Sequence, residues 1–251
     1  MTKTYLTIDS ETHNAGKEYG MPPHEFVRLF QHAWGDGPVE LFEVHTESDL
    51  EFVRDTIRSA DYVIGHNIQN ADLPWIFGPD SDEPLQMALA GKVIDTFVIA
   101  SLVTPTPYSY TDRNGHTYFD AAKPERAMRY LSLDNLCHIY GVGGKMGDLK
   151  ELAKKHNPPK TRVADLDFSL IPLDDPEFRK YAIRDIISAR DVYRYLMDQI
   201  RVQDYDRAYI WRELKIWAIN AEITRNGVKV NREEAEARVA ELKEERDRIM
   251  E

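Results

Sequence analysis

The sequence predicts an α/β protein whose core is a mixed five-stranded sheet flanked by helices, followed by a C-terminal helical extension. Two observations predict this class. Apolar, strand-like stretches and capped amphipathic stretches follow one another in the order β-β-β-α-β-α-β-α, which is typical of a sheet covered by helices. After Asp204 the character changes to two long helical stretches. We therefore expect one domain over 1–203 and the start of another over 204–251.

Three strands open the chain. Runs of apolar residues predict them at Tyr5–Ile8, Val27–Trp34 and Val39–Val44. Glycine and proline cluster between them, as they do in turns. We expect these strands to be antiparallel neighbours.

A capped amphipathic helix is predicted next. Ser48 stands at the position of an N-cap and Glu51 follows three residues later, the spacing of a capping box. Leu50, Val53 and Ile57 then form an apolar stripe at helical spacing. We expect the helix to begin after Ser48.

Two further strands complete the predicted sheet. Tyr62–Ile64 is an apolar strand, a short helix follows Ala71, and Lys92–Ile94 is a strand that runs into an apolar stretch. The segment Pro105–Lys123, rich in Pro, Tyr, Asp and Gly, is predicted as an inserted loop or hairpin.

The late helices carry recognisable caps. Ser132 is the expected N-cap of one helix. Asp175 can cap a second and longer helix, with Pro176 at its first position, where proline is favoured. The chain ends within the last predicted helix, at Glu251, so we expect it to be part of a longer protein.

Composition narrows the classes of protein. A single cysteine, Cys137, excludes a disulfide framework and a cysteine-rich zinc site and favours a reducing compartment. The sequence shows neither a signal peptide nor a stretch of about 20 apolar residues, so we expect a cytoplasmic chain without a membrane partner. The formal net charge of -11 argues against binding nucleic acid by bulk positive charge.

Two carboxylates follow the first strand. Asp9 and Glu11 are two residues apart, so their side chains project from one face of an extended chain. They repel each other unless a cation lies between them, and their oxygens suit Mg²⁺ or Mn²⁺. Taken alone, the pair is more often a solvated turn.

Two other places carry candidate side chains. His66, Asn67 and Asp72 follow the fourth strand, where Asp72 alone reads as a helix cap and His66 as a loop histidine. On the long late helix, Tyr181 and Asp185 are four residues apart and share an inward face. A buried Tyr beside an Asp is as often structural as functional.

Taken together, these motifs resemble the tyrosine branch of the DEDD 3′-to-5′ exonuclease superfamily. The order Asp-x-Glu, Asn-x4-Asp and Tyr-x3-Asp agrees with that branch, and "VIDTFVIASLV" and "YLSLDNLCHIYGV" resemble two further segments of it. Many members have three residues between Asn and Asp, whereas four separate Asn67 from Asp72. That spacing is similar to the phage branch of family A DNA polymerases.

The tail supports the same resemblance. "WAINAEITRNGVKVNREEAEARVAELKEERDRI" is similar to the segment that joins the proofreading domain of such polymerases to the polymerase domain. The resemblance implies a ribonuclease H-like fold and a polymerase domain in cis. It covers nearly the whole chain, in which no polymerase motif itself is found.

The resemblance implies a set of site residues. Two divalent ions, Mg²⁺ or Mn²⁺, would be bridged by Asp9, with Glu11 and Asp185 on the nucleophile side and Asp72 on the leaving-group side. Tyr181 would orient the attacking water. The positions near the terminal nucleotide would be Thr12, Ala15, His66 and Asn67.

The expected function is metal-dependent removal of nucleotides from a DNA 3′ end, as the proofreading part of a replicative polymerase. The expected partner is a single-stranded 3′ end or primer terminus, and we expect a monomer, in the host cytoplasm if the source is a phage. One alternative is a stand-alone RNA exonuclease similar to ribonuclease D. Another is an inactive nuclease fold that serves as an interaction module.

Overall fold

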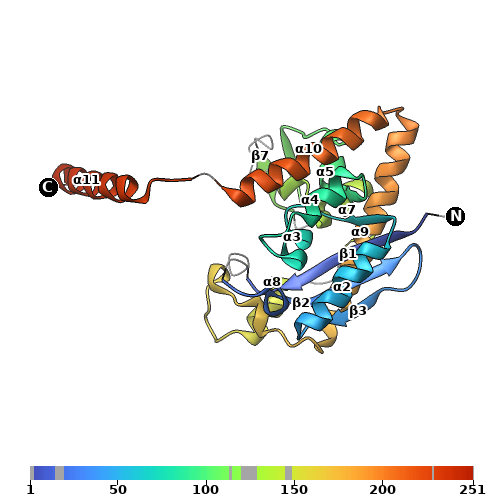
Figure 1. Ribbon diagram of the computed structural model, residues 1–251, viewed down its shortest axis with the longest axis horizontal. Coiled ribbons are helices and arrows are strands. Elements are labelled where there is room, and N and C mark those ends of the chain that lie inside the picture. The colour runs from blue at the N-terminus through green and yellow to red at the C-terminus, as the bar shows by residue number, and fades with distance from the viewer. Residues whose placement is uncertain are drawn as a thin grey trace.

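The computed structural model describes residues 3–14, 20–112, 115–119, 129–144, 149–227 and 229–250. Its centre is a five-stranded mixed sheet in the order β3-β2-β1-β4-β5 (Figure 1). β1 pairs antiparallel with β2 and parallel with β4, β2 pairs antiparallel with β3, and β4 pairs parallel with β5. The strands are β1 (Tyr5–Thr12), β2 (Val27–Trp34), β3 (Glu40–Glu43), β4 (Tyr62–Gly65) and β5 (Val93–Asp95). The predicted α/β class, with five strands flanked by helices, is confirmed.

Helices cover the sheet and continue beyond it. Those described are α1 (Pro23–Phe26), α2 (Glu47–Ser59), α3 (Asp72–Phe77), α4 (Glu83–Leu89), α5 (Thr96–Val103), α7 (Leu133–Tyr140), α8 (Leu149–His156), α9 (Pro176–Val202), α10 (Arg207–Asn226) and α11 (Arg232–Met250). Two short 3₁₀ helices, Val163–Asp165 and Phe168–Leu170, precede α9. The helices α4 and α8 were not among the elements predicted from the sequence.

The two faces of the sheet have different cores. Because side chains alternate along a strand, Leu6 and Ile8 of β1 point to one face, where they pack with Leu50 and Ile57 of α2. On the other face, Leu29 of β2 packs with residues of α8 and α9. We call these the α2 face and the α9 face. Every odd-numbered residue from Tyr5 to Glu11 belongs to the α9 face.

A glycine allows the central strands to approach closely. A Cβ on Gly65, at the end of β4, would lie 2.8 Å from the carbonyl oxygen of Ile8 and 2.2 Å from Cγ2 of Ile68. Real Cβ atoms do not come that close to backbone, so a side chain at this position would push β4 away from β1. Gly65 thereby sets where the loop that starts at His66 leaves the sheet.

The N-terminus of α2 differs from the prediction. The N-cap is Thr46, whose hydroxyl accepts from the backbone N–H of Asp49 while the Asp49 carboxylate accepts from the Thr46 backbone N–H. The predicted cap, Ser48, lies inside the helix and is wrong. Both residues offer a hydroxyl and are followed three residues later by an acidic side chain, but Asp49 closes the box, whereas Glu51 accepts from Arg54 and Arg58.

The predicted cap of the long helix and the predicted hairpin are confirmed, whereas Ser132 holds the N-cap position of its helix without a side-chain cap hydrogen bond. Ser132 is the N-cap residue of α7, and Asp175 accepts from two backbone N–H groups at the start of α9, with Pro176 as the first helical residue. The segment predicted as a loop or hairpin contains β6 (Ser109–Thr111) paired antiparallel with β7 (Thr117–Phe119).

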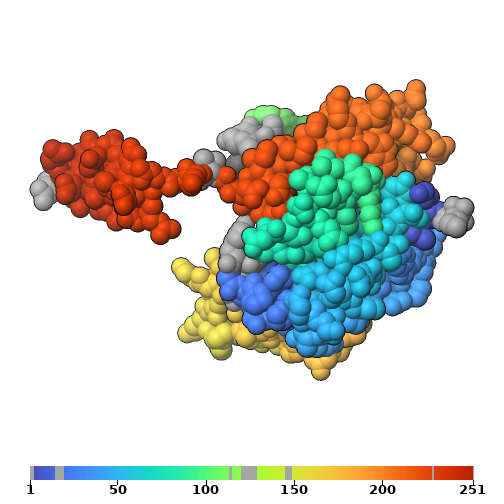
Figure 2. Space-filling view, viewed as in Figure 1, coloured from blue at the N-terminus to red at the C-terminus, as the bar shows by residue number. Residues whose placement is uncertain are grey.

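The last two helices differ in how they contact the body. α10 packs on α4 and α5, and its Ile210, Leu214 and Ala218 are buried in the two main cores. In α11, none of the described residues is buried. Figures 1 and 2 show α11 standing apart from the body. Among the described helices, none is both long and apolar enough to cross a membrane.

Candidate metal centre

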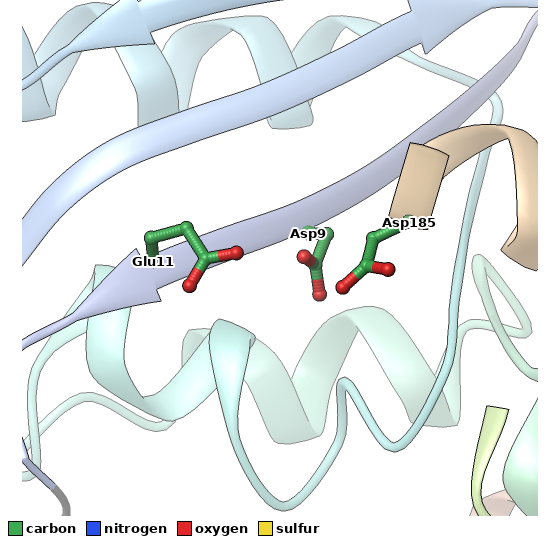
Figure 3. Close-up of side chains that lie close together, drawn as sticks. All are labelled: Asp9, Glu11 and Asp185. Carbon is green, nitrogen blue, oxygen red and sulfur yellow. The ribbon is translucent and has the colours of Figure 1, made fainter. Parts of the chain in front are cut away.

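Three carboxylates from two distant parts of the chain meet on the α9 face. Asp9 and Glu11 lie on β1, and Asp185 lies on α9, which packs across β1, β2 and β4. One carboxylate oxygen from each lies within 4.8 Å of one from each of the others. Figure 3 shows Asp9 and Asp185 side by side, with the Glu11 carboxylate turned toward them from further along β1.

The local sequence explains this convergence. Asp9 and Glu11 share the α9 face because they are two residues apart on a strand. Asp185 is buried, with only 4% of its surface exposed, because it belongs to the stripe of α9 that contains Ala182 and Ile186. A strand and a helix that are each fixed by buried apolar neighbours therefore hold the carboxylates close together.

This cluster suits a divalent cation. Carboxylates this close repel one another, and a cation between them reverses the sign of that interaction. Oxygen-only ligands favour hard ions such as Mg²⁺ or Mn²⁺. Within the described ranges, Asp9, Glu11 and Asp185 form the only group of three or more candidate ligands. The three residues can therefore hold a metal ion.

Gln31 of β2 also contacts the carboxylates of β1. It was not identified from the sequence. It lies directly opposite Asp9 in the β1–β2 ladder and has no exposed surface. Its Nε2 lies 3.2 Å from Oε1 of Glu11 and 3.4 Å from Oδ2 of Asp9, so its amide donates toward both carboxylates. The only available signal was a glutamine inside an apolar strand.

Tyr181 lies one turn before Asp185 on α9, and only 9% of its surface is exposed. Residues four apart on a helix share a face, so the tyrosine and the aspartate are directed to the same side of α9. The shared inward face predicted for Tyr181 and Asp185 is therefore present.

The structure does not bring Asp72 into the three-carboxylate cluster. Asp72 is the first residue of α3, and its Oδ1 accepts a hydrogen bond of 2.6 Å from the hydroxyl of Ser10. Ser10 alternates with Asp9 and Glu11, so its side chain points to the α2 face. Burial raises the pKa of Asp72 to about 6. Its predicted role as the fourth ligand stays a prediction.

Asp95 holds the loop that carries the second motif. Its carboxylate accepts from the backbone N–H groups of Asn67 at 2.8 Å, of Gln69 at 3.0 Å and of Phe97 at 3.0 Å. Burial raises the pKa of Asp95 to about 6 despite these bonds. Asp95 was not identified from the sequence, although an Asp between a strand and a helix is a typical N-cap.

The predicted substrate residues lie at the carboxyl ends of β1 and β4. The hydroxyl of Thr12 donates to the carbonyl of His13, and Nδ1 of His66 lies 3.0 Å from the hydroxyl of Thr96. Asn67 has a left-handed backbone, with φ of 63°, and its Oδ1 accepts from Asn70. Ala15 lies outside the described residues.

The carboxyl end of β1 pairs irregularly with β2 and is held in place by hydrogen bonds. The pairing of β1 with β2 shifts register between Glu11 and Thr12, as in a β-bulge, a feature that re-aims side chains beside active sites. Beyond it, the side chain of Asn14 donates to the carbonyl of Leu166 at 2.7 Å and accepts from the N–H of Phe168 at 2.9 Å. The end of β1 is thus fixed to the segment that precedes α9.

Comparison with known proteins finds a distant likeness among solved structures. No family model matches the chain, and no curated protein does. Among solved structures, the family B DNA polymerase from the hyperthermophilic archaeon Pyrobaculum calidifontis aligns with a TM-score of 0.36 and 17% identity, over 80% of this chain and 25% of that one. The chain therefore spans about a quarter of the length of the polymerase it matches. A likeness this distant carries no conclusion about function.

Proposed function

We propose that this chain is a metal-dependent 3′-to-5′ exonuclease that removes nucleotides from DNA 3′ ends, and that it is the proofreading part of a family A DNA polymerase. The observation that carries the proposal is the meeting of Asp9, Glu11 and Asp185, with Tyr181 one turn before Asp185. The mixed sheet agrees with a ribonuclease H-like fold.

The proposed cofactors are two divalent ions, Mg²⁺ or Mn²⁺. Asp9, Glu11 and Asp185 would hold one. Asp9 and Asp72 would serve the other on the leaving-group side, Asp72 partly through water. The ions, when bound, supply an activated water and stabilise the charge on the leaving 3′ oxygen. Asp72 is mainly ionised above its pKa of about 6, so it is available as a ligand at neutral pH.

The protein's own groups complete the reaction. The hydroxyl of Tyr181 would orient the attacking water. Thr12, His66 and Asn67, together with Ala15, would contact the terminal nucleotide. With a net charge of -11, the chain would grip single-stranded DNA through stacking of bases rather than bulk positive charge.

We further propose that 1–203 is the exonuclease domain and that 204–251 begins a polymerase domain in cis, in a monomeric protein. Apolar side chains exposed on the last two helices support this division. Ile223 of α10 is 60% exposed, and Val239 and Leu242 of α11 are about half exposed. Such side chains are expected where a helix meets further protein.

The proposal is tested by incubating 5′-labelled single-stranded DNA with the chain and Mg²⁺, with and without EDTA. We expect stepwise shortening from the 3′ end that EDTA abolishes. The matched control is Asp191→Asn, which removes a carboxylate from α9 outside the cluster and should retain activity. Shortening of RNA but not DNA would favour the ribonuclease D-like alternative. Shortening of neither would favour the inactive interaction module.

A further inference from the structure

Gln31 joins the two carboxylates of β1 from the neighbouring strand. Its side-chain nitrogen lies 3.2 Å from Glu11 Oε1 and 3.4 Å from Asp9 Oδ2, and the residue has no exposed surface. A carboxamide nitrogen carries two N–H donors, one for each carboxylate. Gln31 is therefore the residue of β2 that links Asp9 to Glu11.

The position of the Gln31 amide is unfavourable for its oxygen atom. Its oxygen, Oε1, is buried and has no hydrogen-bond partner among the described residues. A buried polar atom without a partner destabilises the folded state. An apolar residue at this position of β2 would avoid that cost, because the neighbouring inward residue, Leu29, is apolar and packs in a core. The polar side chain thus lowers local stability unless its donors serve the carboxylates.

A neutral donor suits a cation site better than a charged one. An ammonium or guanidinium group between Asp9 and Glu11 would neutralise the cluster and compete with an incoming ion. A carboxamide restrains both carboxylates and leaves their negative charge in place. Groups that orient ligands in this way typically change metal affinity 10- to 100-fold when they are removed.

We propose that Gln31 is a positioning residue that holds Asp9 and Glu11 in their cation-binding arrangement. The expected effect of Gln31 on exonuclease kinetics rests on the proposed function. Its expected effect on metal affinity requires only that the cluster binds a divalent ion. The inference assigns to β2 a role in the site, in addition to β1 and α9.

Three substitutions test the inference. Gln31→Met keeps the length and volume of the side chain and removes the donors. Gln31→Lys keeps donors but adds positive charge. Phe30→Leu is the control, because this neighbouring residue of β2 is equally buried but packs on the α2 face. Each variant is first checked by thermal unfolding, so that binding is compared only between folded proteins.

The measurements are Mn²⁺ affinity by calorimetry and exonuclease kinetics as a function of Mn²⁺. We expect Gln31→Met to weaken Mn²⁺ binding about tenfold, Gln31→Lys to weaken it further, and Phe30→Leu to leave it unchanged. Excess Mn²⁺ should restore most of kcat in Gln31→Met without a change in the KM for DNA, which a general loss of structure would not produce.

The outcomes separate this inference from the proposed function. If the wild-type chain binds Mn²⁺ but does not shorten DNA, the exonuclease proposal fails, and the Mn²⁺ affinities still decide the role of Gln31. If Gln31→Met binds Mn²⁺ as tightly as the wild type does, the inference is overturned. Absence of Mn²⁺ binding by the wild type would overturn it as well.

Discussion

Neighbouring residues of β1 contribute to two different acidic regions. On the α9 face, Asp9 and Glu11 meet Asp185, and Gln31 donates to the pair on β1. On the α2 face, Ser10 donates to Asp72. In the first region, three carboxylates lie close enough together to bind one cation.

The second region disperses its carboxylates and gives each of them its own hydrogen-bond donors. Asp72 accepts from Ser10, and Asp95 accepts from three backbone N–H groups. Burial raises the pKa of each to about 6. The difference teaches that a buried carboxylate near the end of β1 is by itself no evidence of a metal ligand, whereas three carboxylates with oxygens within 4.8 Å of one another form an arrangement that suits a cation.

The largest effect is expected from breaking the α9-face cluster. Asp185→Asn keeps the shape of the side chain and removes one of the three charges, so the cation loses a ligand and the remaining carboxylates hold it poorly. We expect exonuclease activity to fall at least about 1000-fold and Mn²⁺ binding to be lost, measured by DNA shortening and calorimetry. Activity within tenfold of the wild type would exclude Asp185 as a ligand.

Asp72→Asn tests whether the α2 face contributes to the reaction. We expect about a 100-fold loss of activity, while the Mn²⁺ site formed by the other three carboxylates keeps its affinity, because the structure places Asp72 outside that cluster. Ser10→Ala is the companion variant, since it removes only the hydrogen bond to Asp72. Unchanged activity of Asp72→Asn would remove it from the ligand set and leave it a structural residue.

The raised pKa of Asp95 predicts a dependence of stability on pH. Because the folded state holds the proton of this carboxyl more tightly than the unfolded state does, unfolding releases a proton between about pH 4 and 6. The free energy of unfolding should therefore fall as pH rises through this window and level off above it. Because the pKa of Asp95 rises from its ordinary value of 3.8 to about 6 on folding, the free energy of unfolding should be about 2–3 kcal/mol lower above this window than below it.

Urea unfolding of the wild type and of Asp95→Asn at several pH values measures this contribution. In Asp95→Asn, the free energy of unfolding should fall less steeply with pH than in the wild type. The cooperativity of unfolding should be similar in the two proteins. Parallel pH profiles would show that Asp95 titrates in the folded chain as it does in the unfolded one.

The smallest effect is expected for Tyr181→Phe. Loss of the hydroxyl leaves the three carboxylates in place and removes only a group that orients the attacking water, so activity should fall about tenfold and less than for any ligand. Mn²⁺ affinity should not change. A loss as large as that of Asp185→Asn, together with weaker Mn²⁺ binding, would mean that Tyr181 supports the carboxylates themselves.

Much of the fold was predictable because it depends on local pattern. The strands followed from runs of apolar residues, and the α9 cap followed from the Asp175-Pro176 pair. The predicted cap of α2 was misplaced by two residues because Thr46 and Ser48 offer the same hydroxyl, and the choice depends on which acidic side chain closes the box. The helices α4 and α8 were missed because glycine and proline, which favour turns, lie within or close to both: Pro84 and Gly91 for α4, and Gly147 and Pro158 for α8.

The site was predictable only in part. Asp9 and Glu11 were placed together by strand periodicity, and Asp185 was added by resemblance. The role of Gln31 depends on the register of β2 against β1, which sequence does not specify. The partner of Asp72 is Ser10, which lies between the two acidic residues of the first motif. Only the folded arrangement shows that this serine and its neighbours serve opposite faces.

The central claim is that Asp9, Glu11 and Asp185 form a divalent-cation centre. Anomalous diffraction from crystals soaked in Mn²⁺ tests it most directly. The predicted result is an anomalous peak between these three carboxylates, within about 2.0–2.4 Å of an oxygen from each, and its absence from crystals of Asp185→Asn. Ordered carboxylates with no peak between them at saturating Mn²⁺ would contradict the claim.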